Sequence, residues 1–292
     1  MDIYKYSYID GDKVVETEEG KFFITPKCND KKQVFRYLEQ KDFPFFLPMK
    51  NLFRDSYEVY PYVEDDILPA DKALDLIHIL SLLHIKTTTY QTVVMDNVKE
   101  VYESVSRQIQ DKIDYYQKLQ DDIENHIYMA PDEALFMKNV SLFYQNFQKS
   151  REYLELWYEM KKSQKEERVV FLHKQPCLLH FVDQKTPYFT HWDLSDKGYV
   201  IYDFLYFYKK DYMIVEMNPL FQIYQSKYKF TEDEMLLFFC LLLLDEKVEF
   251  ISSNHYESTI VVQRHVSYAK KVSQFILEQN QKDEETDQSK FN

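Results

Sequence analysis

Glycine is the residue whose scarcity most constrains this chain. Only 3 of the 292 residues are glycine, and glycine is what lets a backbone take positive φ or approach a phosphate closely. The phosphate-binding loops of P-loop and dinucleotide-binding proteins each need several glycines within one short span. The sequence therefore excludes both kinds of loop, and also the glycine-flanked nucleophile of many hydrolases.

The remaining composition is that of a globular, acidic protein. Hydrophobic residues make up 45% of the chain, which argues against disorder, and the length allows a sizeable core. There are 36 Lys and Arg against 49 Asp and Glu, a net charge of −13. Because nucleic acids and anionic membranes attract positive surfaces, we expect neither as a partner. Abundant aromatic residues (25 Tyr and 22 Phe) suit a core and a protein-binding surface.

Several features predict a cytoplasmic location. Cys28, Cys177 and Cys240 lie far apart, with no metal-ligand spacing, and are typical of reduced thiols. The N-terminus has neither the basic region nor the apolar region of a signal peptide. The longest apolar run, Met235 to Leu244, is too short to cross a bilayer, so we expect no membrane insertion.

The first 66 residues have the pattern of a small antiparallel sheet. Asp10-Gly11 between two alternating runs predicts a hairpin, and Glu19-Gly20 predicts a second turn. A helix is expected from Lys31 to Gln40, another extended piece between Pro44 and Pro48, and a last strand at Tyr57–Val63. The predicted order is β-β-β-α-β-β for a domain over residues 1–66.

Helices dominate the predicted second domain, residues 67–281. The segment 70–84 is apolar on nearly all sides, as in a buried helix. Residues of about 95–128 carry a heptad-like stripe, and a second helix follows to about residue 160, so we expect an antiparallel hairpin. The stripe favours a seam within the chain over a dimer interface, and the choice between monomer and dimer stays open.

The C-terminal third is expected to begin with strands and end in helices. Short strands are predicted at 169–172, 188–192 and 199–202, the last two forming a hairpin at about 188–203. Three helices should follow, the second with a capping box that begins at Thr231. Residues 282–292 are polar and charged, and we expect a disordered tail there.

This order of elements resembles the protein-kinase-like fold of the aminoglycoside and choline phosphotransferases, and within it the bacterial spore-coat kinase-like proteins. The resemblance covers nearly the whole chain. It rests on the element order, on the AxxLIxxLxxLH character of Ala73 to His84, and on LLH…YVIYDF at residues 178–204. It implies an α+β, bilobal fold with a small antiparallel β-rich N-lobe and a mainly helical C-lobe that contains a long helical hairpin.

The resemblance also implies where catalytic residues should lie. The catalytic loop of the family reads H-G-D-x-x-x-x-N, followed by a hairpin and I-D-F/W. Here His180 resembles the loop histidine, and Asp203 resembles the metal ligand. Val182 and Pro187 then occupy the positions of the catalytic Asp and the Asn, and Asp183 lies one residue late. A competing register, in which His191-Trp192-Asp193-Leu194 begins the loop, leaves only nine residues between Asp193 and Asp203, too few for the loop, the Asn and two hairpin strands.

The N-lobe also departs from the family pattern. Lys27 is the best candidate for the phosphate-binding lysine of the third strand, Lys21 is the second, and Glu39 is a candidate helix partner. Both lysines are equally well explained as solvated surface residues. The first hairpin carries Asp10 and Asp12, whose carboxylates would repel the phosphates of ATP.

Two functional hypotheses follow from the resemblance. The first is a catalytically degenerate, kinase-like protein that needs no cofactor and acts by binding a protein partner, as a spore-coat or related assembly factor. The second is an active ATP-dependent small-molecule phosphotransferase with Mg-ATP as cofactor, Asp183 as base, Asp203 for the metal ion and Lys27 for the phosphates. A third reading, an unrelated α+β scaffold, would make the element order a coincidence.

Overall fold

The structure is a computed structural model that describes residues 3–9, 12–26, 31–46, 57–62, 67–183, 187–251 and 253–290. By contacts the chain forms two compact units: residues 1–90 with 168–229, and residues 91–167 with 230–292. The chain passes from the first unit to the second near β5 (Thr89–Thr92) and returns in β6 (Glu166–Leu172). The boundary predicted at residue 66 stays a prediction.

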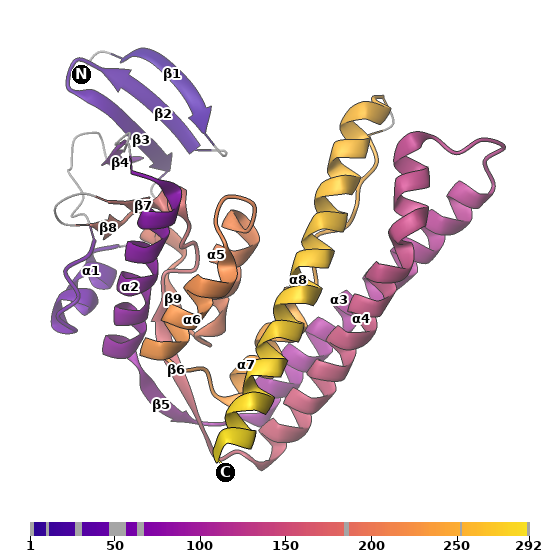
Figure 1. The fold of residues 1–292 in the computed structure, drawn as a ribbon. Coiled ribbons are helices and arrows are strands. Elements are labelled where there is room, and N and C mark those ends of the chain that lie inside the picture. The colour runs from indigo at the N-terminus through magenta and orange to yellow at the C-terminus, as the bar shows by residue number, and fades with distance from the viewer. Residues whose placement is uncertain are drawn as a thin grey trace. The chain divides into compact units, whose positions relative to one another are not determined.

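The first unit begins with an antiparallel sheet of four strands in the order β1-β2-β3-β4 (Figure 1). The strands are β1 (Ile3–Ile9), β2 (Asp12–Thr17), β3 (Gly20–Pro26) and β4 (Tyr57–Pro61), and α1 (Lys31–Gln40) lies between the last two in sequence. Ile9 pairs with Asp12, as the predicted first hairpin requires, although Asp10 and Gly11 lie outside the described residues. Gly20 has a φ of 124°, which explains the glycine at the second turn.

The sheet has two different faces. Val15, Phe22 and Val59 form a cluster on one face, and Val14 and Phe23 form a cluster on the other. Tyr62 and Leu179 pack against the Val14–Phe23 cluster. Leu179 belongs to the loop of residues 173–180, so this second face of the sheet packs against that loop.

The rest of the first unit contains three helices and strands of two small sheets. It contains α2 (Pro69–Thr87), α5 (Ile201–Asp211) and α6 (Met217–Lys227), and α2 packs against α6. Strands β7 (Phe181–Val182) and β8 (Tyr188–Phe189) form an antiparallel hairpin, while β9 (Asp196–Gly198) pairs with β6. A Cβ on Gly198 would lie 2.7 Å from Leu172 Cδ1, so a larger residue there would require the buried Leu172 side chain to shift. Predicted burial of the 70–84 helix is confirmed, since Leu76, Leu80 and other residues of α2 are buried.

The predicted hairpin at 188–203 is wrong. Strand β8 ends at Phe189 because His191 takes a left-handed φ of 57° and a 3-10 turn, η2 (Trp192–Leu194), follows. The predicted strand at 199–202 is replaced by the start of α5. Ile201, Phe204, Leu205 and Tyr208 are buried at helical spacing, and this longer pattern overrides the short apolar run.

The second unit is helical. It contains α3 (Met95–Glu124), α4 (Pro131–Ser163), α7 (Glu232–Leu242) and α8 (His255–Lys290), and α4 packs against each of the other three (Figure 1). The predicted antiparallel hairpin is confirmed as α3 and α4, with Tyr116 of the heptad stripe surrounded by Phe136, Phe143 and Phe147. The predicted capping box is also present, because Thr231 N donates to Glu234 Oε2 at 2.9 Å.

The C-terminal segment differs from its prediction. Helix α8 continues through Lys290, where the sequence predicts a disordered tail from residue 282. The segment contains no proline or glycine and several good helix formers, so nothing in it stops the helix. Among the described residues, no helix is both long enough and apolar enough to cross a bilayer.

Candidate functional site

The candidate site is built from two segments that flank the β7–β8 hairpin: a loop of residues 173–180, which ends in the 3-10 turn η1 (Leu178–His180), and residues 190–192. The backbone ties the segments together, since Thr190 N donates to the His180 carbonyl at 2.9 Å and Thr190 Oγ1 donates to it at 3.1 Å. Both segments belong to the first unit. Residues distant in sequence are thereby fixed side by side beneath the N-terminal sheet.

Asp203, in the first turn of α5, anchors the start of the loop. Its side chain is fully buried, and its carboxylate accepts hydrogen bonds from His173 N at 2.8 Å and Lys174 N at 2.6 Å. His84 Nε2 lies 3.1 Å from Oδ2. Since backbone and imidazole donors engage both carboxylate oxygens, they compensate the cost of burying the charge.

His84 extends this contact across three helices. Its Nε2 faces Asp203 of α5, and its Nδ1 lies 2.6 Å from the hydroxyl of Tyr224 in α6. With the ring proton on Nε2 toward the carboxylate, Nδ1 accepts the hydroxyl proton of Tyr224. This role of His84 was not predicted from the sequence, where the one indication is a histidine on an apolar helix.

Asp211, at the other end of α5, holds the end of the loop. Its carboxylate accepts a hydrogen bond from Leu178 N at 2.9 Å. Burial raises the pKa of Asp211 to about 6, although the Leu178 N–H favours the charged form. Helix α5 therefore fixes both ends of the 173–180 loop, Asp203 at one end and Asp211 at the other.

His173 lies at the centre of the loop's packing. It is fully buried, and its Nε2 donates to the Thr190 carbonyl at 2.6 Å. Its ring centroid is 4.6 Å from that of Trp192 and 4.8 Å from that of Phe189. Burial lowers the pKa of His173 to about 4, against the opposing charge of Asp203, so the ring is neutral at pH 7.

A column of four rings connects the loop to the sheet. We call Tyr62, Phe23, His191 and His180 the aromatic column. Successive ring centroids are 5.0, 5.5 and 4.1 Å apart, and the two imidazoles are stacked. His180 and His191 are both buried. The column links the Val14–Phe23 face of the sheet to the loop through ring contacts.

The ring nitrogens of the column are held by nearby groups. His180 Nδ1 donates to the Gln175 carbonyl at 2.8 Å, and His191 Nδ1 lies 2.7 Å from Thr190 Oγ1. The imidazoles are therefore oriented by hydrogen bonds as well as by stacking. The described residues include no group of three or more His, Cys, Asp and Glu that could hold a metal ion.

The structure separates the predicted site residues. It places His180 with His191, and Asp203 with His84 and the start of the loop. Asp183 is buried at the end of β7, and Lys27 lies outside the described residues. Of the alternatives, Lys21 is half-buried with its Nζ 6.0 Å from the Tyr62 ring, and Glu39 is exposed on α1. The catalytic, metal-binding and phosphate-binding roles stay predictions.

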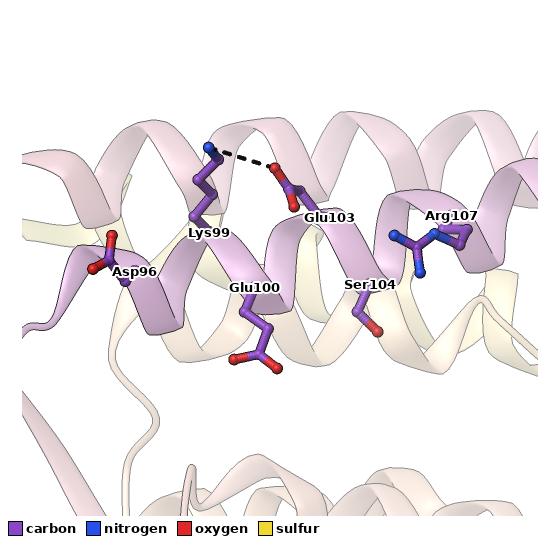
Figure 2. A pocket seen from close by; sticks show the side chains of 6 residues that line it. All are labelled: Asp96, Lys99, Glu100, Glu103, Ser104 and Arg107. Carbon is purple, nitrogen blue, oxygen red and sulfur yellow. Dashed lines mark ion pairs between the residues drawn. The ribbon is translucent and has the colours of Figure 1, made fainter.

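A groove elsewhere in the chain carries no such organisation. Figure 2 shows its lining, six side chains that all come from α3, among them an ion pair of Lys99 and Glu103 at 3.7 Å. Every one of the six residues is exposed, and their side chains point outward rather than toward one centre (Figure 2). This groove is a solvated helix face.

Comparison with known proteins identifies the fold. No protein-family model matches the sequence, and no curated protein matches it. An aminoglycoside phosphotransferase from Alicyclobacillus acidocaldarius matches in structure with a TM-score of 0.63 and 10% identity, over 97% of this chain and 93% of that one. Spectinomycin phosphotransferase in its AMP-bound complex matches with a TM-score of 0.53 and 14% identity, over 92% and 93%.

A third solved structure extends the comparison to sugar kinases. Glucosamine kinase in complex with glucosamine, ADP and inorganic phosphate has a TM-score of 0.52 and 8% identity, over 96% of this chain and 83% of that chain. The predicted α+β, protein-kinase-like fold is confirmed, and it is the fold of aminoglycoside phosphotransferases and small-molecule kinases.

Proposed function

We propose that this chain is a catalytically degenerate, kinase-like protein that acts by binding another protein. One observation carries the proposal, the position of the β7–β8 hairpin. In the family pattern the catalytic loop H-G-D-x-x-x-x-N comes before the hairpin, and I-D-F/W comes after it. The eight residues that precede β7 read H-K-Q-P-C-L-L-H, residues 173–180, and those that follow β8 read T-H-W, residues 190–192.

This register aligns the family's reacting groups with unsuitable side chains. Gln175 stands at the position of the catalytic base, His180 at that of the Asn, and His191 at that of the metal-binding Asp. A glutamine amide cannot take a proton from a hydroxyl group at neutral pH. Mg²⁺ prefers oxygen ligands, and both candidate ligands are imidazoles. All three replacements favour a site without phosphoryl-transfer chemistry.

The same register gives Asp203 a structural role. Its carboxylate is buried and engaged by His84 and by two backbone N–H groups of the loop. We propose that Asp203 positions the loop, in place of the metal-binding role that the first register implies. In this register His173 is the loop histidine, and His180 stands at the position of the metal-binding Asn.

The aromatic column supports the proposal that this protein does not bind a nucleotide. Phe23 lies on the sheet face that covers the loop, and its ring packs against His191 and Tyr62. A nucleotide between sheet and loop would have to displace these rings and lose their packing. We therefore propose that the protein uses no cofactor, while Mg-ATP remains the cofactor if the chain is an active phosphotransferase.

The partner and the setting are proposed from the resemblance. The spore-coat kinase-like proteins suggest a role in assembling a spore coat or a related surface structure, from the cytoplasm. The acidic net charge of −13 supports a protein partner over a nucleic acid.

A phosphoryl-transfer assay tests the proposal. The purified chain is incubated with Mg-ATP and a panel of aminoglycosides, amino sugars and amino alcohols, and ADP release is measured. We expect no acceptor-dependent release. Transfer to any acceptor that is abolished by Asp183→Asn would overturn the proposal and favour the rearranged active site.

A further inference from the structure

The loop between α3 and α4 exposes apolar side chains that the fold does not use. Ile127 is 90% exposed, Tyr128 is 89% exposed, and Met129 is 46% exposed. They are three in a row, and Ile127 and Tyr128 are the most exposed large hydrophobic residues in the part of the chain that the structure describes. Exposing such side chains to water costs free energy, which a bound partner would recover.

The loop is held in place rather than loosely connected. Asn125 N donates to the Asp121 carbonyl at 3.2 Å, and Ala130 N donates to Glu133 Oε2 at 2.8 Å. His126 Nδ1 lies 3.0 Å from Glu133 Oε1. Both ends of the loop are thus fixed to the helices that it joins, so the apolar side chains are presented without a large ordering cost.

The start of α8 adds to the same end of the unit. Figure 1 shows α8 beginning at the end where α3 and α4 are joined, and His255 Nδ1 lies 3.1 Å from Asp132 Oδ1 near the start of α4. Tyr256, the next residue, is 75% exposed. We call Ile127, Tyr128, Met129 and Tyr256 the apolar tip.

The segments that carry the apolar tip are acidic. Residues 119–137 and 248–263 contain no Lys or Arg. We call their exposed acidic residues nearest the tip in sequence, Asp121, Asp122, Glu124 and Glu257, the acidic rim. Glu133 is half-buried and faces His126, while Asp132 is buried and faces His255. Lys118, Lys138, Lys247 and Arg264 stand directly outside these segments, and the whole stretch keeps a net negative charge. It therefore favours a basic partner over an anionic surface.

We propose that the apolar tip docks a basic, amphipathic segment of a partner protein, with apolar side chains against Ile127 and Tyr128 and Lys or Arg side chains toward the acidic rim. Aromatic side chains at the centre of a patch and complementary charge around it are what a specific protein interface requires. The inference deepens the proposed binding function, on which it rests, by naming the surface and the chemistry of its partner.

A peptide titration tests the docking surface. The full chain is titrated by fluorescence anisotropy with a labelled amphipathic helix of Leu and Lys, and with the same helix carrying Glu in place of Lys. We expect saturable binding of the Leu/Lys helix, weakened about tenfold or more by I127S/Y128S. We also expect weaker binding at high salt and none of the Leu/Glu helix.

The matched control is M213S/I214S, which removes two exposed apolar residues of the first unit, 61% and 58% exposed. This variant should bind like the parent chain. Because the tip residues are exposed, I127S/Y128S should also unfold at the same urea concentration as the parent. Equal binding by the two double variants, or no saturable binding of the Leu/Lys helix, would overturn the proposal.

Two other occupants are distinguished in the same series. Sedimentation of the chain alone would reveal a dimer that I127S/Y128S dissolves, and that result would assign the tip to a second copy of the chain. Binding to anionic phospholipid vesicles that requires the tip would assign it to a membrane. Either result overturns the peptide assignment without bearing on phosphoryl transfer, which the acceptor assay measures separately.

Discussion

The two units bury charge in different ways. In the first, the Asp203 carboxylate is compensated by two backbone N–H groups and the His84 imidazole. In the second, Lys161 at the end of α4 lies between two carboxylates, 3.0 Å from Glu167 of β6 and 2.9 Å from Asp233 of α7. The first arrangement fixes the loop that precedes β7, whereas the second joins α4, β6 and α7.

The difference indicates what each unit has kept. The loop of residues 173–180 is held at both ends by α5, as an active-site loop would need to be. In the proposed register, Gln175 and the stacked imidazoles of His180 and His191 stand at the positions of the reacting groups. The helical unit has a core of packed rings around Tyr116. Its unusual feature, the apolar tip, is on the surface. A fold that keeps its scaffold but lacks the catalytic side chains can still bind a partner, as the proposed function requires.

Removing the buried lysine should have the largest effect. Lys161→Met leaves Glu167 and Asp233 buried without their cation, and we expect the free energy of unfolding to fall by about 3 to 5 kcal/mol. Urea unfolding measures the change. The neighbouring Lys162→Met is the control, because Lys162 is exposed and its ion pair with the exposed Glu159 is on the surface, so its effect should stay below about 1 kcal/mol. Similar losses in the two variants would refute the assigned role of Lys161.

Removing the loop anchor should cost slightly less. Asp203→Ala leaves the N–H groups of His173 and Lys174 without an acceptor in a buried site, and we expect a loss of about 3 kcal/mol in urea unfolding. Asp203→Asn keeps one acceptor oxygen and should recover part of this loss. Asp196→Ala is the control, since its side chain is 71% exposed and 3.7 Å from Lys174 Nζ. A stable Asp203→Ala variant would mean that α5 does not anchor the loop.

The buried imidazole should make stability depend on pH. The pKa of His173 is about 4 in the folded chain, because of burial, against an ordinary 6.5. Between these values the unfolded state binds a proton that the folded state does not, so stability falls as the pH falls. Relative to His173→Gln, the parent should lose about 2 kcal/mol between pH 7 and pH 5. A difference between parent and variant that does not change with pH would contradict this.

Sequence patterns predicted the elements better than the site. The helical hairpin could be predicted because its heptad-like stripe repeats over many residues. The Thr231 capping box could be predicted because it depends on residues only three apart. The strand expected at 199–202 is wrong because a run of four apolar residues fits a strand and a helix equally well. The buried residues from Ile201 to Tyr208 recur at helical spacing, and the segment folds as α5. Long patterns were reliable, and a short apolar run was ambiguous.

The site could not be assembled from sequence, because its residues meet only through tertiary structure. His84, His173, His191 and Phe23 come from four separate segments, and nothing about their spacing indicates that they meet. The register of the catalytic-loop pattern depends on where the hairpin lies, and the hairpin strands are two residues each. Strands that short leave almost no periodicity for a sequence pattern to detect.

The most direct test of the central claim is a calorimetric titration of the purified chain with Mg-ATP, repeated with Phe23→Ala and His191→Asp. We predict no saturable heat for the parent at millimolar nucleotide, because a nucleotide would have to displace the rings of the aromatic column. The proposed register also places Gln175 and His191 where the family has its two catalytic aspartates. Saturable Mg²⁺-dependent binding by the parent, lost on Asp203→Asn in a variant that remains folded, would contradict the account. It would show that Asp203 serves a nucleotide site after all.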